Sequence, residues 1–197
     1  MGQEFECKYR ATPEKIAAIR AEFGPFREIR METTYYDTPT RQLSQRRWTL
    51  RRRLENGVSV CTIKIPGKDG ARGEWETEEE EITSGIPMLC KLMGSTQLAE
   101  LTAAGVEATC GARFTRLAAT LEVPGGIVEL ALDAGVLLGG GREIPLWEVE
   151  VELKSGPHDA AIGFGEELAN RFGLTPETAS KFKRARDLAE QERENGI

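Results

Sequence analysis

Residues 144–154 alternate acidic and apolar side chains with almost no interruption. Successive side chains of a β-strand point to opposite faces, so this segment predicts a strand with one charged and one apolar face. The same two-faced pattern recurs in residues 3–10, 48–53, 58–65, 71–76 and 127–133. In residues 144–154, one face carries Glu148, Glu150 and Glu152, and the other carries Val149, Val151 and Leu153. A chain built from such segments folds around a sheet.

We expect a single domain over residues 1–197, of the α+β class, with a largely antiparallel sheet. The dipeptide Asn56-Gly57 between two alternating segments is typical of a tight hairpin turn. The expected strands are residues 3–10, 28–37, 48–55, 58–65, 71–82, 112–123, 127–133 and 144–154. The expected helices are residues 13–23, 87–107 with a break at Gly94, 157–172 and 179–193.

Two interpretations of the charged faces compete. A solvated sheet face alternates in this way, and so does a barrel whose charged face lines the inside while helices cover the apolar outside. Charge sign sorts by strand, with Arg51 and Arg53 on one strand and Glu148 and Glu150 on another, and this sorting favours the barrel. Arginine in place of lysine suits bidentate contact with phosphate oxygens.

Such a lumen has a defined chemistry. Close pairs of cations repel by about 4 kcal/mol at an effective dielectric near 20, and a bound polyanion relieves that repulsion. Carboxylates repel a polyanion unless a divalent cation such as Mg²⁺ or Mn²⁺ lies between them. Basic side chains, an acidic cluster and a metal together indicate phosphoryl transfer.

Composition excludes several other classes. The chain has 26 Lys and Arg against 32 Asp and Glu, a formal net charge of −6, which argues against a general nucleic-acid binder. No apolar run is long enough for a membrane span and the charged start is no signal peptide, so we expect a cytoplasmic protein. The four cysteines are too far apart for a CxxC pair and His158 is the sole histidine, so a zinc site is not expected.

Short motifs in order along the chain resemble those of the CYTH domain, the core of the triphosphate tunnel metalloenzymes. The resemblance covers nearly the whole chain and is closest to the bacterial inorganic triphosphatases, without the helical CHAD module that often accompanies them. The motifs are Glu4-Phe5-Glu6-Cys7-Lys8, Tyr35-Tyr36-Asp37-Thr38, Leu50-Arg51-Arg52-Arg53, Thr62-Ile63-Lys64, Arg72-Gly73-Glu74, Glu148-Val149-Glu150 and Ser180-Lys181-Phe182.

The resemblance implies an eight-stranded antiparallel β-barrel, the triphosphate tunnel, with surrounding helices. It implies hydrolysis of inorganic triphosphate (tripolyphosphate) with Mg²⁺ or Mn²⁺, and family members are often homodimers. A class IV-type adenylyl cyclase and a thiamine or nucleoside triphosphatase remain alternatives. A non-catalytic polyphosphate- or nucleotide-binding module is a further alternative, against which the intact acidic set argues.

The resemblance also assigns roles to residues. Arg52 lies between two inward arginines, so we expect it to point outward, and Arg184 is a weaker candidate than Lys181. Trp48, Trp75 and Trp147 lie opposite the charged faces and are expected in the core. The implied metal ligands are Glu4, Glu6, Asp133, Glu148 and Glu150. The implied phosphate-binding residues are Lys8, Arg51, Arg53, Lys64, Arg72, Arg116 and Lys181. The implied catalytic residues are Glu4, Glu6, Lys8 and Lys181.

Overall fold

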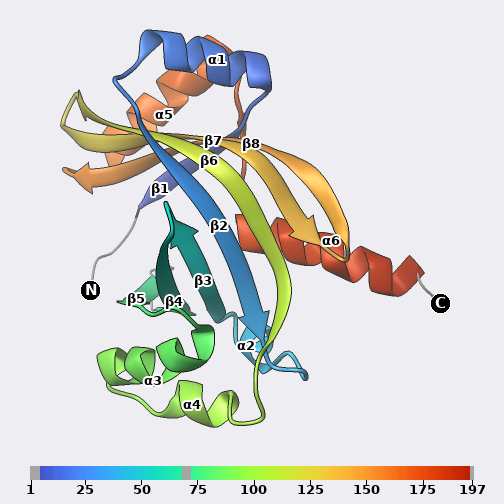
Figure 1. Ribbon diagram of the computed structural model, residues 1–197. Coiled ribbons are helices and arrows are strands. Elements are labelled where there is room, and N and C mark those ends of the chain that lie inside the picture. The colour runs from blue at the N-terminus through green and yellow to red at the C-terminus, as the bar shows by residue number, and fades with distance from the viewer. Residues whose placement is uncertain (1–4, 68–71, 196–197) are drawn as a thin grey trace.

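One curved antiparallel sheet forms the centre of the molecule (Figure 1). The computed structural model describes residues 5–67 and 72–195; the side chains of Arg72 and of residues 192–195 are not described. Within these ranges nine strands run in the order β5-β4-β3-β2-β6-β7-β8-β1-β9. They are β1 (Glu6–Arg10), β2 (Arg27–Asp37), β3 (Thr49–Glu55), β4 (Val58–Pro66), β5 (Arg72–Glu78), β6 (Glu107–Val123), β7 (Gly126–Gly139), β8 (Arg142–Ser155) and β9 (Thr175–Pro176).

The antiparallel α+β class is therefore confirmed. The ninth strand is the two-residue β9, which pairs with β1. The sheet curls into a tunnel-like shape (Figure 1). Within the described ranges its edge strands β5 and β9 are not paired with one another, so the hydrogen-bond ladder does not close.

Two groups of helices cover the convex face of the sheet. α1 (Pro13–Glu22) and α5 (His158–Phe172) pack on β1, β7 and β8, where Ile19, Leu168 and Val149 are buried together. α3 (Ile82–Met93) packs on β4 and β5, and α4 (Gln97–Leu101) packs against α3. Leu89 and Ile63 are buried in this cluster. Trp48, Trp75 and Trp147 pack in or against these outer clusters, as expected from their strand parity.

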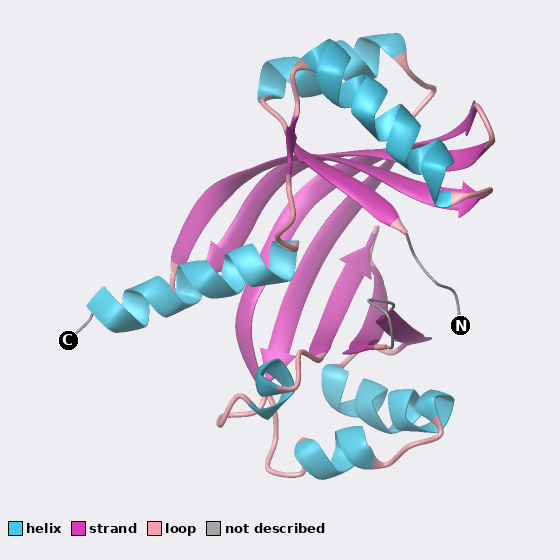
Figure 2. Ribbon diagram, turned by 180° about the vertical axis from the view of Figure 1, so that it is seen from behind, coloured by secondary structure: helices cyan, strands magenta, loops and turns pink. Residues whose placement is uncertain are grey.

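The last helix occupies the other side of the sheet. α6 (Lys181–Asn195) lies in the concavity, where it packs on β6 and β7 (Figure 2). Ala185 belongs to an apolar cluster with Ile29 and Phe114, and Phe182 packs against this cluster. Helices α1, α3, α4 and α5 cover the outside as expected, whereas α6 lies on the inner face, with Lys181 at its start. Apolar side chains of β2, β6 and β7, such as Met31, Ala112 and Leu137, form one part of the concave face, and α6 packs against this part.

Several elements have other bounds than the sequence-based prediction. β5 ends at Glu78, four residues before the expected end, and β6 begins at Glu107, five residues before the expected start. The break expected at Gly94 is confirmed, because α3 ends at Met93 with Gly94 as its C-cap and α4 follows. However, α3 begins five residues before the expected start, at Ile82, with Pro87 inside it. Strand β7 runs to Gly139, six residues beyond the expected end, because it pairs with β6 and β8 along its whole length. Tertiary pairing overrides local propensity in these places.

Local signals account for the turns next to the concave face. Asn56 and Gly57 both have positive φ, as a two-residue hairpin between β3 and β4 requires. The buried carboxylate of Asp37 accepts hydrogen bonds from the backbone amides of Thr38, Leu43 and Ser44 and thereby fixes the short helix α2 (Gln42–Gln45). The Tyr35-Tyr36-Asp37-Thr38 motif therefore has a structural role at this point.

No described helix combines the length and the apolar character needed to cross a bilayer.

Candidate functional site

Strand register places the acidic residues in rows on the concave face. Asp133 is directly opposite Arg116 on one side and Glu148 on the other. In the next row Glu150 lies between Ala131 and Lys8. The small Ala131 leaves room in front of the sheet, so longer side chains from both sides converge over it.

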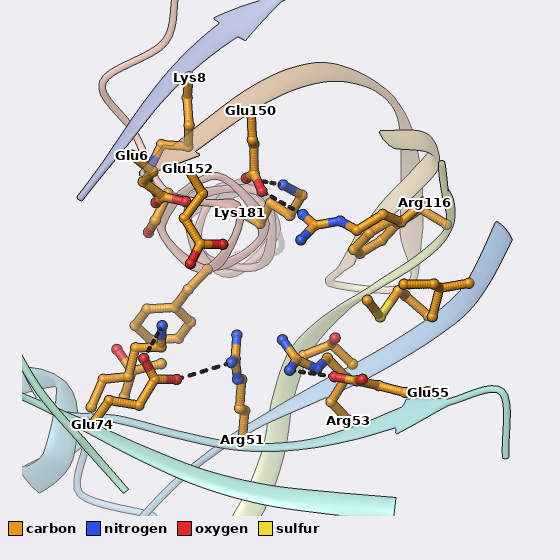
Figure 3. A pocket seen from close by; sticks show the side chains of 18 of the residues that line it. Glu6, Lys8, Arg51, Arg53, Glu55, Glu74, Arg116, Glu150, Glu152 and Lys181 are labelled. Carbon is orange, nitrogen blue, oxygen red and sulfur yellow. Dashed lines mark hydrogen bonds and ion pairs between the residues drawn. The ribbon is translucent and has the colours of Figure 1, made fainter. Parts of the chain in front are cut away.

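The concave face encloses a polar cavity of ≈ 380 Å³, shown in Figure 3. Its acidic half comes from β7, β8 and β1, and its basic half from β3 and β4. Its charged lining comprises Glu6, Lys8, Arg27, Arg51, Arg53, Glu55, Lys64, Glu74, Glu76, Arg116, Glu129, Glu150, Glu152, Lys154 and Lys181. The inward orientation of the charged strand faces is therefore observed.

Three buried carboxylates form a cluster at the acidic end. One oxygen each from Asp133, Glu148 and Glu150 lies within 4.8 Å of the others. The ammonium of Lys181, at the start of α6, is placed among them, 2.8 Å from Asp133 Oδ2 and 2.6 Å from Glu150 Oε1, and it also contacts Glu148 Oε1. The side chain of Lys181 is 11% exposed, so its charge is compensated almost entirely by these three groups.

Two arginines, together with Lys181, compensate the negative charge of this cluster. Arg116 donates from Nε and Nη2 to the two oxygens of Asp133, each at 2.8 Å, and Nη2 also contacts Glu150 Oε2. Arg184 donates to Glu148 Oε2 at 2.9 Å. Three carboxylates thus face three cations, which is the condition for keeping charges buried.

This environment moves the pKa values in opposite directions. Burial raises the pKa of Glu148 to about 7, against the opposing effect of Lys181. Burial acts in the same sense on Glu150, but Lys181 and Arg116 outweigh it and hold the pKa of Glu150 well below its usual range. Burial would lower the pKa of Lys181, yet Asp133, Glu150 and Glu148 together raise it above the usual lysine value. Lys181 is therefore a permanent cation in this site.

The basic half of the cavity carries its own carboxylates. Arg51 lies 3.3 Å from Glu74, and Lys64 lies 2.8 Å from the same residue. Arg53 contacts Glu55 and lies 3.9 Å from Glu76. Burial, followed by the neighbouring Arg51, lowers the pKa of Arg53. Among the described residues, the Nε atoms of Arg51 and Arg53 are buried and have no hydrogen-bond partner. An anionic ligand in the cavity would satisfy donors of this kind.

The structure places the residues predicted from the sequence as follows. Arg116 and Lys181, expected to bind phosphate, are ion-paired with the expected metal ligands Asp133, Glu148 and Glu150. Lys8, Arg51, Arg53 and Lys64 line the cavity, as does Glu6, which lies outside the carboxylate cluster and contacts Lys8 at 3.1 Å. Arg52 points away, with its Nε 3.0 Å from Ser59 Oγ. Glu4 and the side chain of Arg72 lie outside the described residues.

Sequence analysis missed one buried carboxylate next to the cluster. Glu177 is 6% exposed and accepts hydrogen bonds from Arg10 Nε at 2.5 Å and Arg184 Nη1 at 3.0 Å. These two arginines outweigh the effect of burial and lower the pKa of Glu177 to about 2. Its position after the short β9 has no periodic pattern, so the sequence offers no strand signal for it.

The carboxylate cluster fits a divalent cation. Carboxylate oxygens are the hard donors that Mg²⁺ and Mn²⁺ take, and three of them converge. The ammonium of Lys181 already places a positive charge between these carboxylates. The residues that would hold the metal are Asp133, Glu148 and Glu150.

The site defines the class of protein: a tunnel-like antiparallel sheet whose concave face has a carboxylate cluster at one end and basic side chains at the other. The CYTH domain model matches residues 2–185, and the chain belongs to the CYTH family. The expectation from the short motifs is thereby confirmed.

Comparisons with individual proteins agree with this family. The chain is 28% identical over 191 residues to an inorganic triphosphatase of Haemophilus influenzae, covering 93% of this chain and 54% of that protein. It therefore spans about half the length of this curated relative.

Solved structures share the fold. A candidate adenylyl cyclase from Hippeastrum, for which a dominant triphosphatase activity is described, has a TM-score of 0.62 at 21% identity and covers 95% and 96% of the two chains. A candidate adenylate cyclase from Bacillus halodurans also has a TM-score of 0.62, at 18% identity, covering 93% of this chain and 98% of that one.

Proposed function

We propose that this chain hydrolyses inorganic triphosphate with the help of Mg²⁺ or Mn²⁺. The observation that carries the proposal is the pair Arg51 and Arg53, whose buried Nε donors lack partners among the described residues. Both arginines line a cavity that Glu150 also lines, and Glu150 belongs to the cluster of three convergent carboxylates. An anion with many oxygens satisfies these donors, and a metal joins that anion to the carboxylates. The Haemophilus relative is named for the same activity.

The side chains divide the work by position. Arg51, Arg53, Lys64 and Lys8 bind the phosphoryl oxygens along the cavity, and Arg72 is assigned to the same group. Asp133, Glu148 and Glu150 hold the metal, with Glu6 and Glu4 as further acidic groups from the N-terminal strand. When bound, the metal neutralises phosphoryl oxygens and polarises water.

Lys181 and Arg116 have a double role in this proposal. Both pair with the carboxylate cluster in the absence of ligand. If Asp133, Glu148 and Glu150 held a divalent cation, its charge would take over their compensation. Lys181 and Arg116 would then be available to stabilise negative charge on the phosphoryl oxygens. Attack of water on a terminal phosphorus breaks the P–O bond to the bridging oxygen and yields phosphate and pyrophosphate.

The aromatic residues of the cavity favour an inorganic substrate. Tyr35 and Phe182 contact each other, with ring centroids 4.9 Å apart, and the ring of Phe114 faces Lys181 at 5.4 Å. The three tryptophans pack in or against the outer clusters. These aromatic side chains already pack against other side chains of the protein, which makes them less available for stacking on a nucleobase or a thiamine ring.

The test is release of phosphate from tripolyphosphate, ATP and thiamine triphosphate, each with Mg²⁺, Mn²⁺ or EDTA. We expect metal-dependent release that is fastest with tripolyphosphate and lost in Glu150→Gln. The matched control is Glu167→Gln, on the exposed side of α5. Formation of cyclic AMP from ATP would instead support a cyclase. Tight binding of tripolyphosphate without hydrolysis would make the protein a polyanion-binding module.

A further inference from the structure

Glu177 occupies an unusual position for a carboxylate. It follows β9 directly, precedes α6, and is 6% exposed. Acidic side chains are rarely buried to this extent unless they are paired. Glu177 does not line the cavity, so a role in direct substrate contact does not explain its burial.

Glu177 connects three parts of the fold. Its backbone amide donates to the carbonyl of Lys8 at 2.8 Å, which continues the pairing of β1 with β9. Its carboxylate accepts from Arg10 Nε and from the amide of Ala179, the latter at 2.8 Å. Glu177 thus fixes the approach of the chain to α6, from which Lys181 and Arg184 extend.

Arg184 is shared between Glu177 and the carboxylate cluster. Its Nη1 lies 3.0 Å from Glu177 Oε2 and 2.9 Å from Glu148 Oε2. The second oxygen of Glu148, Oε1, contacts Lys181 and belongs to the side of the cluster where a metal would bind. The two oxygens of Glu148 are therefore divided between a structural partner and the cluster.

A freed Arg184 would have a different preference. Arginine binds carboxylates most strongly through two parallel hydrogen bonds, as Arg116 does with Asp133. Without the pull of Glu177, the guanidinium of Arg184 can engage both oxygens of Glu148. That arrangement would withdraw Glu148 Oε1 from the metal position.

We propose that Glu177 is a positioning residue for the metal site: by holding Arg184, it keeps one oxygen of Glu148 directed at the carboxylate cluster. The inference rests on the proposed function, because it assigns Glu148 to a divalent cation. Groups that orient metal ligands affect metal affinity by about 10–100-fold when they are removed.

The experiment measures the affinity of the full chain for Mn²⁺ alone, from the electron paramagnetic resonance signal of the free ion. Glu177→Gln preserves shape and the acceptor for Ala179 but removes the charge that holds Arg184. We expect it to weaken Mn²⁺ binding about tenfold or more. In a tripolyphosphate assay it should raise the Mn²⁺ concentration required, and kcat should recover at saturating Mn²⁺.

Two further variants separate positioning from general stability. Arg10→Gln removes the other ion pair of Glu177, one whose arginine does not contact Glu148, and should change Mn²⁺ affinity by about twofold at most. In an Arg184→Met background, Glu177→Gln should have little further effect, within about threefold, because the path to Glu148 is already gone. If Glu177→Gln does not fold, Glu177→Asp takes its place in the same comparisons, since its shorter side chain draws the carboxylate away from Arg184.

The outcomes separate this inference from the proposed function. Equal loss of affinity in Glu177→Gln and Arg10→Gln, or an undiminished effect of Glu177→Gln without Arg184, would overturn the positioning role. So would a Glu177→Gln variant that binds Mn²⁺ like the wild type, while hydrolysis by the wild type left the proposed function intact. A wild-type protein that neither binds Mn²⁺ nor releases phosphate would overturn both.

Discussion

The ammonium nitrogen of Lys181 lies 2.6 Å from Glu150 Oε1, deep in the concave face of the sheet. The two residues come from α6 and β8, so their contact depends on the docking of the last helix into the concavity. The pair also has Asp133 and Glu148 as neighbours, and it forms the electrostatic centre of the site.

Replacing Lys181 by Met should destabilise the protein and abolish hydrolysis. The substitution leaves three buried carboxylates with one cation fewer, and breaking a buried ion pair costs about 3–5 kcal/mol. Urea unfolding measures this loss. The control is Lys183→Met on the same helix, because the exposed pair of Lys183 with Asp187 should contribute less than about 1 kcal/mol. Equal stability losses in the two variants would contradict this account of the cluster.

Removal of metal should leave the fold intact. Lys181, Arg116 and Arg184 already compensate the carboxylates, so the far-ultraviolet circular dichroism spectrum in EDTA should match that in Mn²⁺. Added Mn²⁺ should still raise the free energy of unfolding, by about 2.7 kcal/mol at 100 times its Kd. Loss of secondary structure in EDTA would show that the cations of the protein do not substitute for the metal.

Substitution of the three consecutive arginines of β3 should follow strand parity. Arg51→Ala and Arg53→Ala remove cavity cations and should each raise the KM for tripolyphosphate about tenfold or more, as expected for charge-assisted contacts. Arg52→Ala should leave KM unchanged, because its guanidinium contacts Ser59 on the other face of the strand. A rise in KM for Arg52→Ala comparable with that of its neighbours would contradict the observed orientation.

Glu177 should contribute a pH-dependent part of the stability. Its pKa is about 2 in the folded protein, below the value near 4.5 of an unpaired glutamate. A depressed folded pKa stabilises above the unfolded pKa, and this stability is lost as pH falls from about 5 toward 2. Urea unfolding of the wild type and Glu177→Gln should therefore differ by roughly 3 kcal/mol at pH 7 and converge near pH 2. A difference that stays constant over this range would show that the ionised form of Glu177 is not specifically stabilised.

Strand parity explains most of what could be predicted of the site. A side chain two residues away lies on the same face, so Arg51, Arg53, Glu148 and Glu150 could be assigned to the concave face from spacing alone, and they lie there or in the adjoining cluster. The outer position of Trp147 follows from the same rule.

The remaining features depend on tertiary contacts that no local pattern records. The pairing of Lys181 with the carboxylates requires α6 to enter the concavity, and a helix with an apolar stripe fits either face of a sheet equally well. Glu177 acts through a strand of two residues, too short for periodicity to show. Helix α3 contains Pro87, and an internal proline argues locally against a helix that runs through this position.

The place of β1 in the sheet has a consequence for biosynthesis. This strand is near the beginning of the chain, yet in the backbone register of the sheet Arg10 lies opposite Glu148 and Lys8 lies opposite Glu150. The partners are separated by about 140 residues, which a ribosome adds in ~7–28 s at about 5–20 residues per second. During that interval β8 has not been synthesised, so β1 cannot pair with it. The strand pairing that places Lys8 beside Glu150 is therefore absent. The rate of translation therefore sets the earliest moment at which the acidic half of the cavity can assemble.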